Sequence, residues 1–353
     1  MSQRGKYSGQ GSFKKVLFQD FDLPSEISDI LTKTANMAIA DKTKSTYNTA
    51  LNNVKNCELE LNESLSFPWD DRKTLLFIGW LVKRDVKTTT IRSYLSGVQK
   101  SHVACGFKGL DQDSPLIKEV LLGHKNKHAQ GRVNDIRAKR LPATINVLRF
   151  LKTKIRTSNL SSHEKITLWA ACTICFYGAL RSSEALSKYE NFFDPTVTLC
   201  KKDVILCKDD DVESLHLTIK HSKTNKSGID ETVIIYANNS DLCPIKAAKK
   251  LLILNRDVPL SYPFFSLESG KPLSQRKFNS VLGDLTKDQI RGGTISSHSF
   301  RIGITSLLAK KGFSDSELKK VGRWSSRAFK CYIRLSRTNR ASMAKACSNI
   351  ENV

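Results

Sequence analysis

The apolar pattern of this chain changes once, across a charged stretch between Gly123 and Pro142 that reads GHKNKHAQGRVNDIRAKRLP. Before this stretch, apolar residues recur at three- and four-residue spacing, which is typical of amphipathic helices. After it, helical patterns alternate with short runs rich in β-branched residues. We therefore expect a polar, basic and flexible arm over residues 1–26, an all-helical domain over 27–128, a linker over 129–141, and a mixed domain over 142–353.

Two helices of the first domain are clear from their periodicity. TKSTYNTALNNVK and KTTTIRSYLSGVQKSHVACG each place apolar residues on one side and leave basic residues on the outer side. These outer basic residues are Lys44, Arg92 and Lys100. They either contact an anionic partner or form an ordinary solvated face.

The second domain begins and resumes with helices and holds a group of strands between them. LPATINVLRFLKTKI, HEKITLWAACTICFYGAL and CPIKAAKKLLILN have helical patterns, whereas DVILC, ESLHLTIK and ETVIIY read as strands separated by the turns CKDDDV and SKTNKSG. The expected fold class is mainly α with a small antiparallel β-sheet.

The last ninety residues carry several helix start and stop signals. Ser296 or Ser297 can cap a helix through FRIGITSLLAKK that ends at Gly312. SDSELKKVG contains a capping box, with Ser314 and Glu317 three residues apart, and closes at Gly322. Ser325 or Ser326 can begin a third helix, which would carry Tyr332.

The charge balance points to a polyanionic partner. The chain has 57 Lys and Arg against 34 Asp and Glu, a net charge of +23. Nucleic acid fits this excess better than a membrane surface, because no basic amphipathic helix with a broad aromatic face is evident. Within the linker, Arg137, Lys139 and Arg140 are candidates for contacts with a phosphate backbone, and a plain solvated linker is the alternative.

Neither the cysteines nor the acidic residues indicate a metal centre. The nine cysteines have no framework spacing, and the close pair Cys172 and Cys175 lies in an apolar helical run, so we expect it to pack in the core. The only dense acidic cluster, Asp209–Asp211, falls in a hairpin turn whose side chains diverge. We expect no metal and no other cofactor, and the chain has no GxxxxGK[ST] nucleotide loop.

Four cationic or titratable residues stand where secondary structure does not require them. Arg181 follows an apolar helix, Lys223 lies at the mouth of a hairpin, and His298 and Arg301 share one side of a helix start. Singly, each has an ordinary local explanation, such as capping or solvation. Together with a tyrosine nucleophile they match the needs of metal-free phosphodiester cleavage, namely cations on the non-bridging oxygens and an acid for the leaving hydroxyl.

The ordered series GALRSSEAL, HSKTNK, HSFRIG, GRWSS and CYIR resembles the catalytic domain of the tyrosine recombinase (phage-integrase-type) family. The resemblance covers about residues 141–336, and the helical domain before it resembles that family's core-binding domain. The form GRWSS followed by AFKCYIR is most similar to recombinases of eukaryotic mobile elements such as cryptons.

This resemblance implies a role for each matching residue. Tyr332 would attack the scissile phosphate to form a 3′-phosphotyrosyl link, and Arg181 and Arg301 would bind its non-bridging oxygens. Lys223 would protonate the leaving 5′-oxygen, and His298 would either assist proton movement or stabilise the pentavalent phosphate. The remaining members of the set are Trp324, at the position that is His or Trp in the family, and Glu184, which would orient the cluster.

One departure concerns the spacing before the tyrosine. Many family members place the His or Trp nine residues before it, whereas Trp324 is eight before Tyr332 and Arg323 is nine before it. Either the connecting loop is shorter with Trp324 in its role, or Arg323 contributes a third cation. We favour Trp324, because GRW opens the same segment in the mobile-element forms.

The resemblance also implies partners and a setting. The expected activity is that of a DNA strand transferase, independent of metal and ATP, which integrates or excises a mobile element as a homotetramer on two double-stranded DNA duplexes, with no membrane association. A eukaryotic element would place it in the nucleus. The alternatives are a domesticated recombinase that binds DNA without strand transfer and a type IB topoisomerase, which uses the same chemistry.

Overall fold

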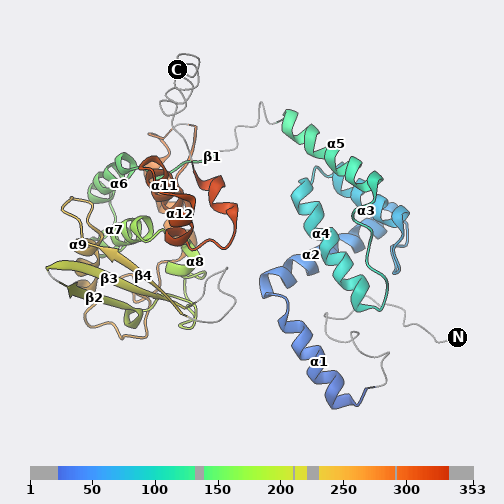
Figure 1. Cartoon of the computed structure of the whole chain (residues 1–353), viewed down its shortest axis with the longest axis horizontal. Helices are drawn as coiled ribbons and strands as arrows, with labels where there is room; N and C mark the ends of the chain where they lie inside the picture. Colours follow the sequence, from blue (N-terminus) through green and yellow to red (C-terminus); the bar gives the residue numbers. More distant parts are fainter. Residues whose placement is uncertain (1–22, 132–138, 210, 221–229, 291, 334–353) are drawn as a thin grey trace, which may run out of the picture. The chain divides into compact units, whose positions relative to one another are not determined.

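The computed structural model describes residues 23–131, 139–209, 211–220, 230–290 and 292–333, and the chain forms two compact units (Figure 1). The units are Met1–Asp135 and Ile136–Val353. Each has its own hydrophobic core, so each is described by itself. None of the described helices is long and apolar enough to cross a membrane.

The N-terminal unit is all helical in its described part. Its helices are α1 (Ser25–Met37), α2 (Asp41–Leu61), α3 (Asp71–Lys83), α4 (Thr88–Ala104) and α5 (Pro115–Gly131). α1 begins two residues inside the segment expected to be an arm, directly after Pro24, whose fixed φ suits a helix start.

The core of this unit lies between α2, α3 and α4. Phe77, Ile78 and Leu81 of α3 are fully buried. Ile91 of α4 is also fully buried, as the apolar periodicity of its segment predicts. α2 and α4 approach closely at Gly97, where an added Cβ would lie 2.9 Å from the ring of Tyr47. This close packing holds the outer faces of α2 and α4, which carry the basic residues, in fixed directions.

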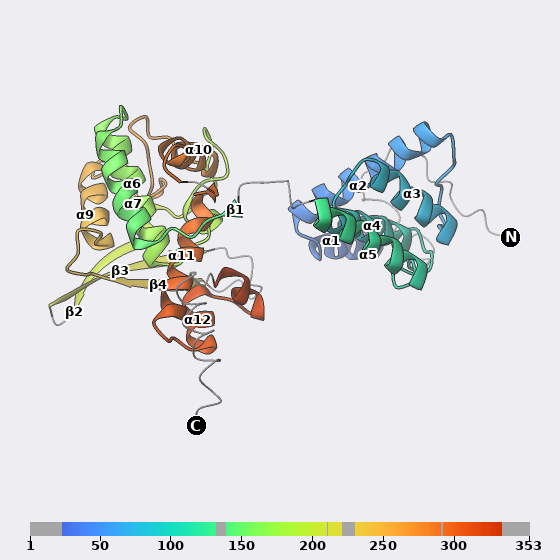
Figure 2. The same cartoon turned by 90° about the horizontal axis from the view of Figure 1, so that it is seen from above.

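The C-terminal unit packs helices over one face of a small sheet (Figure 2). The antiparallel strands β2 (Val204–Asp209), β3 (Val212–Ile219) and β4 (Glu231–Tyr236) lie in the order β2-β3-β4, and the short η2 (Lys201–Asp203) precedes them. Helices α6 (Ile145–Thr157), α7 (Ser162–Tyr177), α9 (Pro244–Leu254) and α10 (Gln275–Thr286) complete this layer. The three predicted strands are confirmed, but β2 extends to Asp209, two residues beyond DVILC and into the stretch CKDDDV predicted as a turn. Residue 210 and the other hairpin loop, 221–229, lie outside the described residues.

The core of this unit centres on α7. Cys172 and Cys175 are buried in it with Phe176, so the expectation that this pair packs in the core is confirmed. Burial raises the pKa of the Cys175 thiol to about 12, which keeps the thiol protonated and unreactive.

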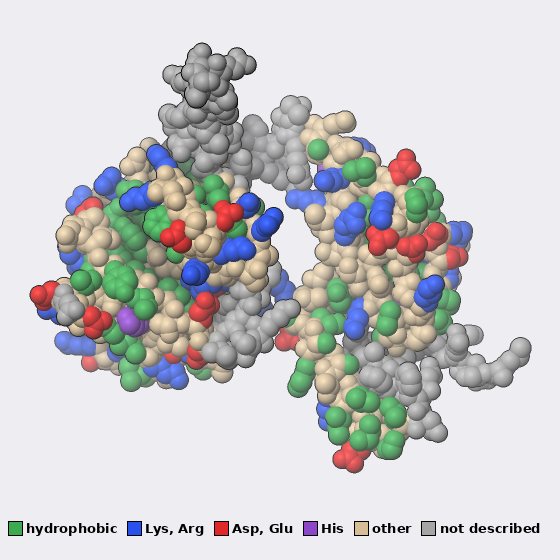
Figure 3. Space-filling view, in the orientation of Figure 1, with side chains coloured by type: hydrophobic (Ala, Val, Ile, Leu, Met, Phe, Trp, Pro, Cys, Tyr) green, Lys and Arg blue, Asp and Glu red, His purple; other side chains and the backbone are tan. Residues whose placement is uncertain are grey.

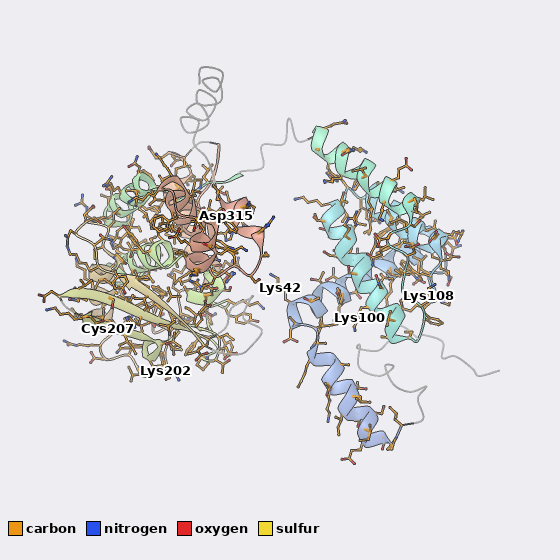
Figure 4. All side chains as sticks on the ribbon, in the orientation of Figure 1. Lys42, Lys100, Lys108, Lys202, Cys207 and Asp315 are labelled. Atoms are coloured by element: carbon orange, nitrogen blue, oxygen red, sulfur yellow. The ribbon has the colours of Figure 1, made fainter. Side chains whose placement is uncertain are left out.

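The remaining elements build the region where the candidate site lies. They are β1 (Lys139–Arg140), the four-residue α8 (Ser182–Ala185), β5 (Gly293–Thr294), α11 (Ser297–Lys310), α12 (Asp315–Gly322) and the 3₁₀ helix η3 (Arg327–Tyr332). β1 pairs in parallel with β5, so the end of the segment expected as a linker is a strand of the C-terminal unit. Asp315 of α12, labelled in Figure 4, forms an ion pair of 3.2 Å with Lys330 of η3.

The helix signals near the C-terminus are largely confirmed. Ser296 precedes α11, Ser314 and Glu317 form the predicted capping box of α12, and Gly312 has the left-handed φ of 89° expected at a helix end. The third helix differs from the prediction: it is a 3₁₀ helix that begins at Arg327, and Tyr332 is its last residue. Two turns of 3₁₀ helix span the same six residues, so Tyr332 still lies two turns from the start.

Candidate active site

Arg181 lies where the chain leaves the buried helix α7 and turns. α7 ends at Tyr177, Ala179 adopts a left-handed φ of 46°, and Arg181 is the residue before α8. The fully buried carboxylate of Glu184 receives the backbone N–H of Arg181 at 2.8 Å and its Nη1 at 2.5 Å. This short helix therefore fixes the direction of the Arg181 guanidinium.

Glu184 is ionised despite its burial. Burial alone would raise its pKa, but the charge of Arg323, the backbone N–H of Arg181 and the charge of Arg181 outweigh burial and hold the pKa below its ordinary value. The carboxylate is thus a fixed negative charge between two guanidinium groups.

Arg301 is the largest fully buried side chain of the described residues and is the fifth residue of α11. Its Nη1 donates to the carbonyl of Ala179 at 2.5 Å, and its Nη2 donates to the carbonyl of Gly322. Its guanidinium carbon lies 4.3 Å from the centre of the Trp324 ring. A buried guanidinium needs such partners, because an uncompensated buried charge is strongly destabilising.

The glycine of HSFRIG has a packing reason that the sequence does not reveal. A Cβ on Gly303 would lie 2.0 Å from the carbonyl oxygen of Ala143, because the chain entering α6 crosses α11 there. The Ala143 N–H donates to the Ser299 carbonyl at 2.8 Å. This crossing anchors the first two turns of α11, which carry His298 and Arg301.

His298 is half-buried beside three arginines. Burial is the main cause that lowers its pKa to about 4, and the charges of Arg140, Arg301 and Arg181 lower it further. His298 is therefore a neutral imidazole at neutral pH, able to accept a proton. Because the charge of Arg140 lowers the pKa of His298, Arg140, at the end of β1, contributes to the positive electrostatic potential at this site.

Trp324 and Arg323 follow α12. Arg323 ends the helix with a left-handed φ of 52°, so that consecutive side chains turn in different directions. The Trp324 ring packs over Arg301 and against Phe329 of η3, and a Cβ on Gly322 would lie 1.7 Å from that ring. The glycine of GRW is thus required for the position of the tryptophan.

The Arg323 side chain turns inward. Its Nη2 donates to Glu184 Oε2 at 2.7 Å and its Nη1 to the Gly178 carbonyl at 3.1 Å. Its Nε also lies 3.7 Å from the carboxylate of Glu231, the first residue of β4. The end of the β3–β4 hairpin is therefore adjacent to the arginine cluster.

The structure brings together five of the seven predicted catalytic residues: Arg181, Glu184, His298, Arg301 and Trp324. Lys223 lies outside the described residues, in the loop that leads to Glu231. Tyr332 is described by its backbone as the last residue of η3, which packs against α11 and α12, and its side chain lies outside the described part. The sequence indicates Arg323 only as a possible third cation, and nothing in the pattern predicts that its side chain turns inward toward Glu184.

The predicted DNA contacts lie on separate elements. Arg92 of α4 is exposed, and Lys100 of the same helix, labelled in Figure 4, is half-exposed. Lys44 of α2 forms an ion pair with Asp41 at 3.1 Å. Arg140 is exposed in β1, the side chain of Lys139 lies outside the described part, and Arg137 lies outside the described residues. Lys and Arg side chains are also visible over α12 and η3, interspersed with a few acidic ones (Figure 3).

Across the described residues no group of three His, Cys, Asp or Glu side chains has an arrangement that could hold a metal ion. The cluster instead holds three guanidinium groups, those of Arg181, Arg301 and Arg323, against two carboxylates, the buried one of Glu184 and the half-exposed one of Glu231. This excess of positive charge, next to a neutral imidazole, favours binding of an anion with fixed geometry.

No protein-family model and no curated protein matches the sequence. Solved structures do match the fold. The XerH site-specific recombinase bound to palindromic difH is 15% identical, with a TM-score of 0.58 over 88% of this chain and 80% of that chain. A lambda integrase dimer bound to a COC′ core site is 13% identical, with a TM-score of 0.53 over 89% and 76%.

A third similar structure is the Tn1549 transposon integrase in complex with transposon right end DNA, which is 14% identical, with a TM-score of 0.52 over 87% of this chain and 94% of that chain. The chain therefore has the tyrosine recombinase fold, mainly helical with a small three-stranded antiparallel sheet. The expected fold class is confirmed.

Proposed function

We propose that this chain is a site-specific DNA recombinase that cleaves and rejoins DNA strands through a covalent phosphotyrosyl intermediate. The observation that carries this proposal is the convergence of Arg181, the residue before α8, and Arg301 of α11 on the segment Gly322–Trp324 that leads to η3. Residues 120 positions apart in the sequence form one buried cationic cluster beside the element that ends in Tyr332. The similarity of the fold to recombinases and integrases solved with DNA supports the same function.

In this proposal the Tyr332 hydroxyl attacks the scissile phosphorus as the bond to the 5′-oxygen breaks. The phenolic proton passes to His298, whose neutral imidazole can accept it. Lys223 donates a proton to the departing 5′-oxygen, and Arg181 and Arg301 stabilise the charge on the non-bridging oxygens. Attack by a 5′-hydroxyl on the phosphotyrosyl bond reverses these steps, so bond energy is conserved without ATP.

The excess of positive charge, +23 over the whole chain, supports double-stranded DNA as the partner. Lys44, Arg92, Lys100 and Arg140 are proposed to contact phosphates, and Arg137 and Lys139, in the segment that precedes α6, are proposed to extend that contact. A homotetramer on two duplexes is the proposed active assembly, because exchange between two duplexes requires four cleavages.

The GRWSS and AFKCYIR motifs support a mobile-element recombinase of the crypton-like type as the particular role. The element would be integrated or excised in the nucleus of its host. The proposed strand-transfer chemistry does not depend on the mobile-element role or on the nuclear location, because it requires only the catalytic residues named above.

The experiment is to incubate the protein with nicked suicide substrates that tile the DNA flanking its source gene, and to map covalent protein–DNA adducts. A recombinase forms adducts at one or a few sequences and releases a 5′-hydroxyl. DNA binding without adducts on any substrate would instead favour a domesticated binding protein. Relaxation of supercoiled DNA by a monomer, without sequence preference, would favour a type IB topoisomerase.

A further inference from the structure

Arg323 occupies the place nine residues before Tyr332 and is buried there, with a side chain only 6% exposed. Both terminal nitrogens of its guanidinium are occupied by protein acceptors. Nη1 donates to the carbonyls of Gly178 at 3.1 Å and Val321 at 3.4 Å, and Nη2 donates to Ala179 O at 3.3 Å and Glu184 Oε2 at 2.7 Å. Each terminal nitrogen carries two N–H bonds, so these four contacts use all of them.

The same contacts join two segments far apart in the sequence. Glu184 Oε2 is shared between the Arg181 backbone N–H and Arg323 Nη2, while Glu184 Oε1 receives Arg181 Nη1. In return, Arg181 Nη2 donates to the carbonyl of Arg323 at 3.4 Å. Arg181 and Arg323 thus hold each other through one carboxylate and one carbonyl.

Arg301 joins the same two segments a second time, because it donates to the carbonyls of Ala179 and Gly322. The turn after α7, the end of α12 and the start of α11 at Arg301 are therefore linked to one another by hydrogen bonds. A change in the direction of Arg323 would move both the Arg181 guanidinium and the start of the segment that carries Tyr332.

We propose that Arg323 is a positioning residue that acts through Glu184 to orient Arg181 and through the carbonyls of Gly178 and Ala179 to fix the segment leading to Tyr332. This inference rests on the proposed strand-transfer function. Arg323 does not bind the scissile phosphate, since its terminal donors are engaged by the protein. Arg323, nine residues before the nucleophile, therefore links two segments of the protein. Trp324, eight residues before the nucleophile, is the residue that packs on Arg301.

Arg323→Lys is the variant that separates this role from charge alone. A lysine keeps the positive charge beside Glu184, but a single ammonium group has three N–H bonds and lacks the planar fork needed to reach both carbonyls and the carboxylate. We expect the rate of covalent adduct formation at saturating DNA to fall ~10- to 100-fold, because small misplacement of reacting groups is costly. The apparent Kd for DNA should change less than about threefold, since no phosphate contact is lost.

Glu184→Gln is the second variant, and it keeps the shape of the side chain while removing its charge. If Arg323 acts through Glu184, the double variant R323K/E184Q should be no slower than the slower single variant, as expected for coupled residues. Arg156→Lys, at the exposed end of α6, is the matched control and should react at the wild-type rate.

The outcomes separate this inference from the proposed function. A wild-type protein that forms adducts and an R323K variant of equal rate would overturn the positioning role while leaving the function standing. If the rate of adduct formation in R323K/E184Q falls by the product of the two single-variant reductions, Arg323 does not act through Glu184. If R323K weakens DNA binding but leaves this rate unchanged, Arg323 contacts a phosphate instead. A wild-type protein that forms no adduct on any tiled substrate would overturn both. Melting curves of all variants confirm that the folded protein is being compared.

Discussion

The indole ring of Trp324 lies over the guanidinium of Arg301, with 4.3 Å between the guanidinium carbon and the ring centre. Both side chains are buried, at 9% and 0% exposure, so the ring covers the cation from one side while carbonyls of Ala179 and Gly322 bind its edge. A cation held in this way keeps its direction before any substrate binds, which lowers the cost of reorganisation during a reaction.

Replacement of Trp324 by Ala is expected to leave Arg301 without its aromatic cover. Loss of a buried aromatic side chain costs about 3–5 kcal/mol of unfolding free energy, and the cation–π contact adds about 1–2 kcal/mol. We expect lower melting of the C-terminal unit by calorimetry and a ~100-fold slower cleavage rate. Trp324→Phe retains a ring over the guanidinium, so its melting temperature and its cleavage rate should fall much less than those of Trp324→Ala. Equal effects of the two variants would contradict a role for ring stacking.

The glycine of HSFRIG is expected to be intolerant of any side chain. In Gly303→Ala the new methyl group would lie 2.0 Å from the Ala143 carbonyl, a backbone atom that cannot move aside without shifting α6 or α11. We expect a loss of about 3 kcal/mol or more in unfolding free energy.

Gly283→Ala in α10 is the matched control, since nothing lies within 4 Å of its added methyl group. Replacing a glycine inside a helix by alanine should raise the unfolding free energy of the protein by about 0.5–1 kcal/mol. Denaturant titration of both variants measures the difference. Similar stability of the two would show that the crossing of α11 by the chain before α6 is less close than the structure has it.

His298 is expected to remain neutral across the physiological range. Its pKa of about 4 in the folded protein lies below the ordinary value of 6.5. The folded state therefore binds its proton less readily than the unfolded state, so the stability associated with neutral His298 is present above pH 6.5 and is lost as the pH falls toward 4.

NMR titration of the His298 ring in the free protein should show no transition between pH 5.5 and 8. His298→Gln should flatten the pH dependence of unfolding between pH 6.5 and 4. Addition of DNA places a phosphate near the three arginines that lower the pKa, so the pKa should rise. A midpoint near 6.5 without DNA would contradict burial beside Arg140, Arg181 and Arg301.

Arg92 on the exposed face of α4 is expected to contribute to DNA affinity through charge alone. Arg92→Ala should weaken binding similarly on all sequences and reduce the slope of log K against log salt by about 0.9, the value for one phosphate contact. Lys118→Ala on α5 is the control, because Lys118 is already paired with Asp113 at 3.0 Å. Filter binding at several salt concentrations measures both slopes, and an unchanged slope for Arg92→Ala would assign Arg92 to a solvated face.

Local signals in the sequence account for much of this fold. The Ser314–Glu317 capping box, the glycine after α11 and the alternation of the three strands depend on neighbouring residues, and each is found where the pattern predicts it. The mainly helical class with one small antiparallel sheet follows from these signals.

Other features depend on contacts between distant residues and have no local signature. The pairing of β1 with β5 joins positions more than 150 residues apart, so Arg140 reads as part of a linker although it lies in the C-terminal unit. The 3₁₀ form of η3, which packs on α11 and α12, is likewise not indicated by the local pattern of its six residues.

The directions of the Arg323 and Trp324 side chains also depend on contacts with distant residues. A single left-handed residue, with a φ of 52° at Arg323, sends one side chain toward Glu184 and the next over Arg301. Spacing alone does not distinguish an inward from an outward arginine. The buried carboxylate of Glu184, contributed by a helix 139 residues away, decides the direction.

The most direct test of the account is the identity of the residue that becomes linked to DNA. The adduct formed on a suicide substrate is digested with trypsin and nuclease, and the modified peptide is sequenced by mass spectrometry. We predict a nucleotide on Tyr332 in the peptide 331–334, no adduct for Tyr332→Phe despite unchanged DNA binding, and normal adducts for Tyr236→Phe, an exposed tyrosine of β4. A nucleotide on any other residue, or adducts that persist in Tyr332→Phe, would contradict the assignment of the nucleophile.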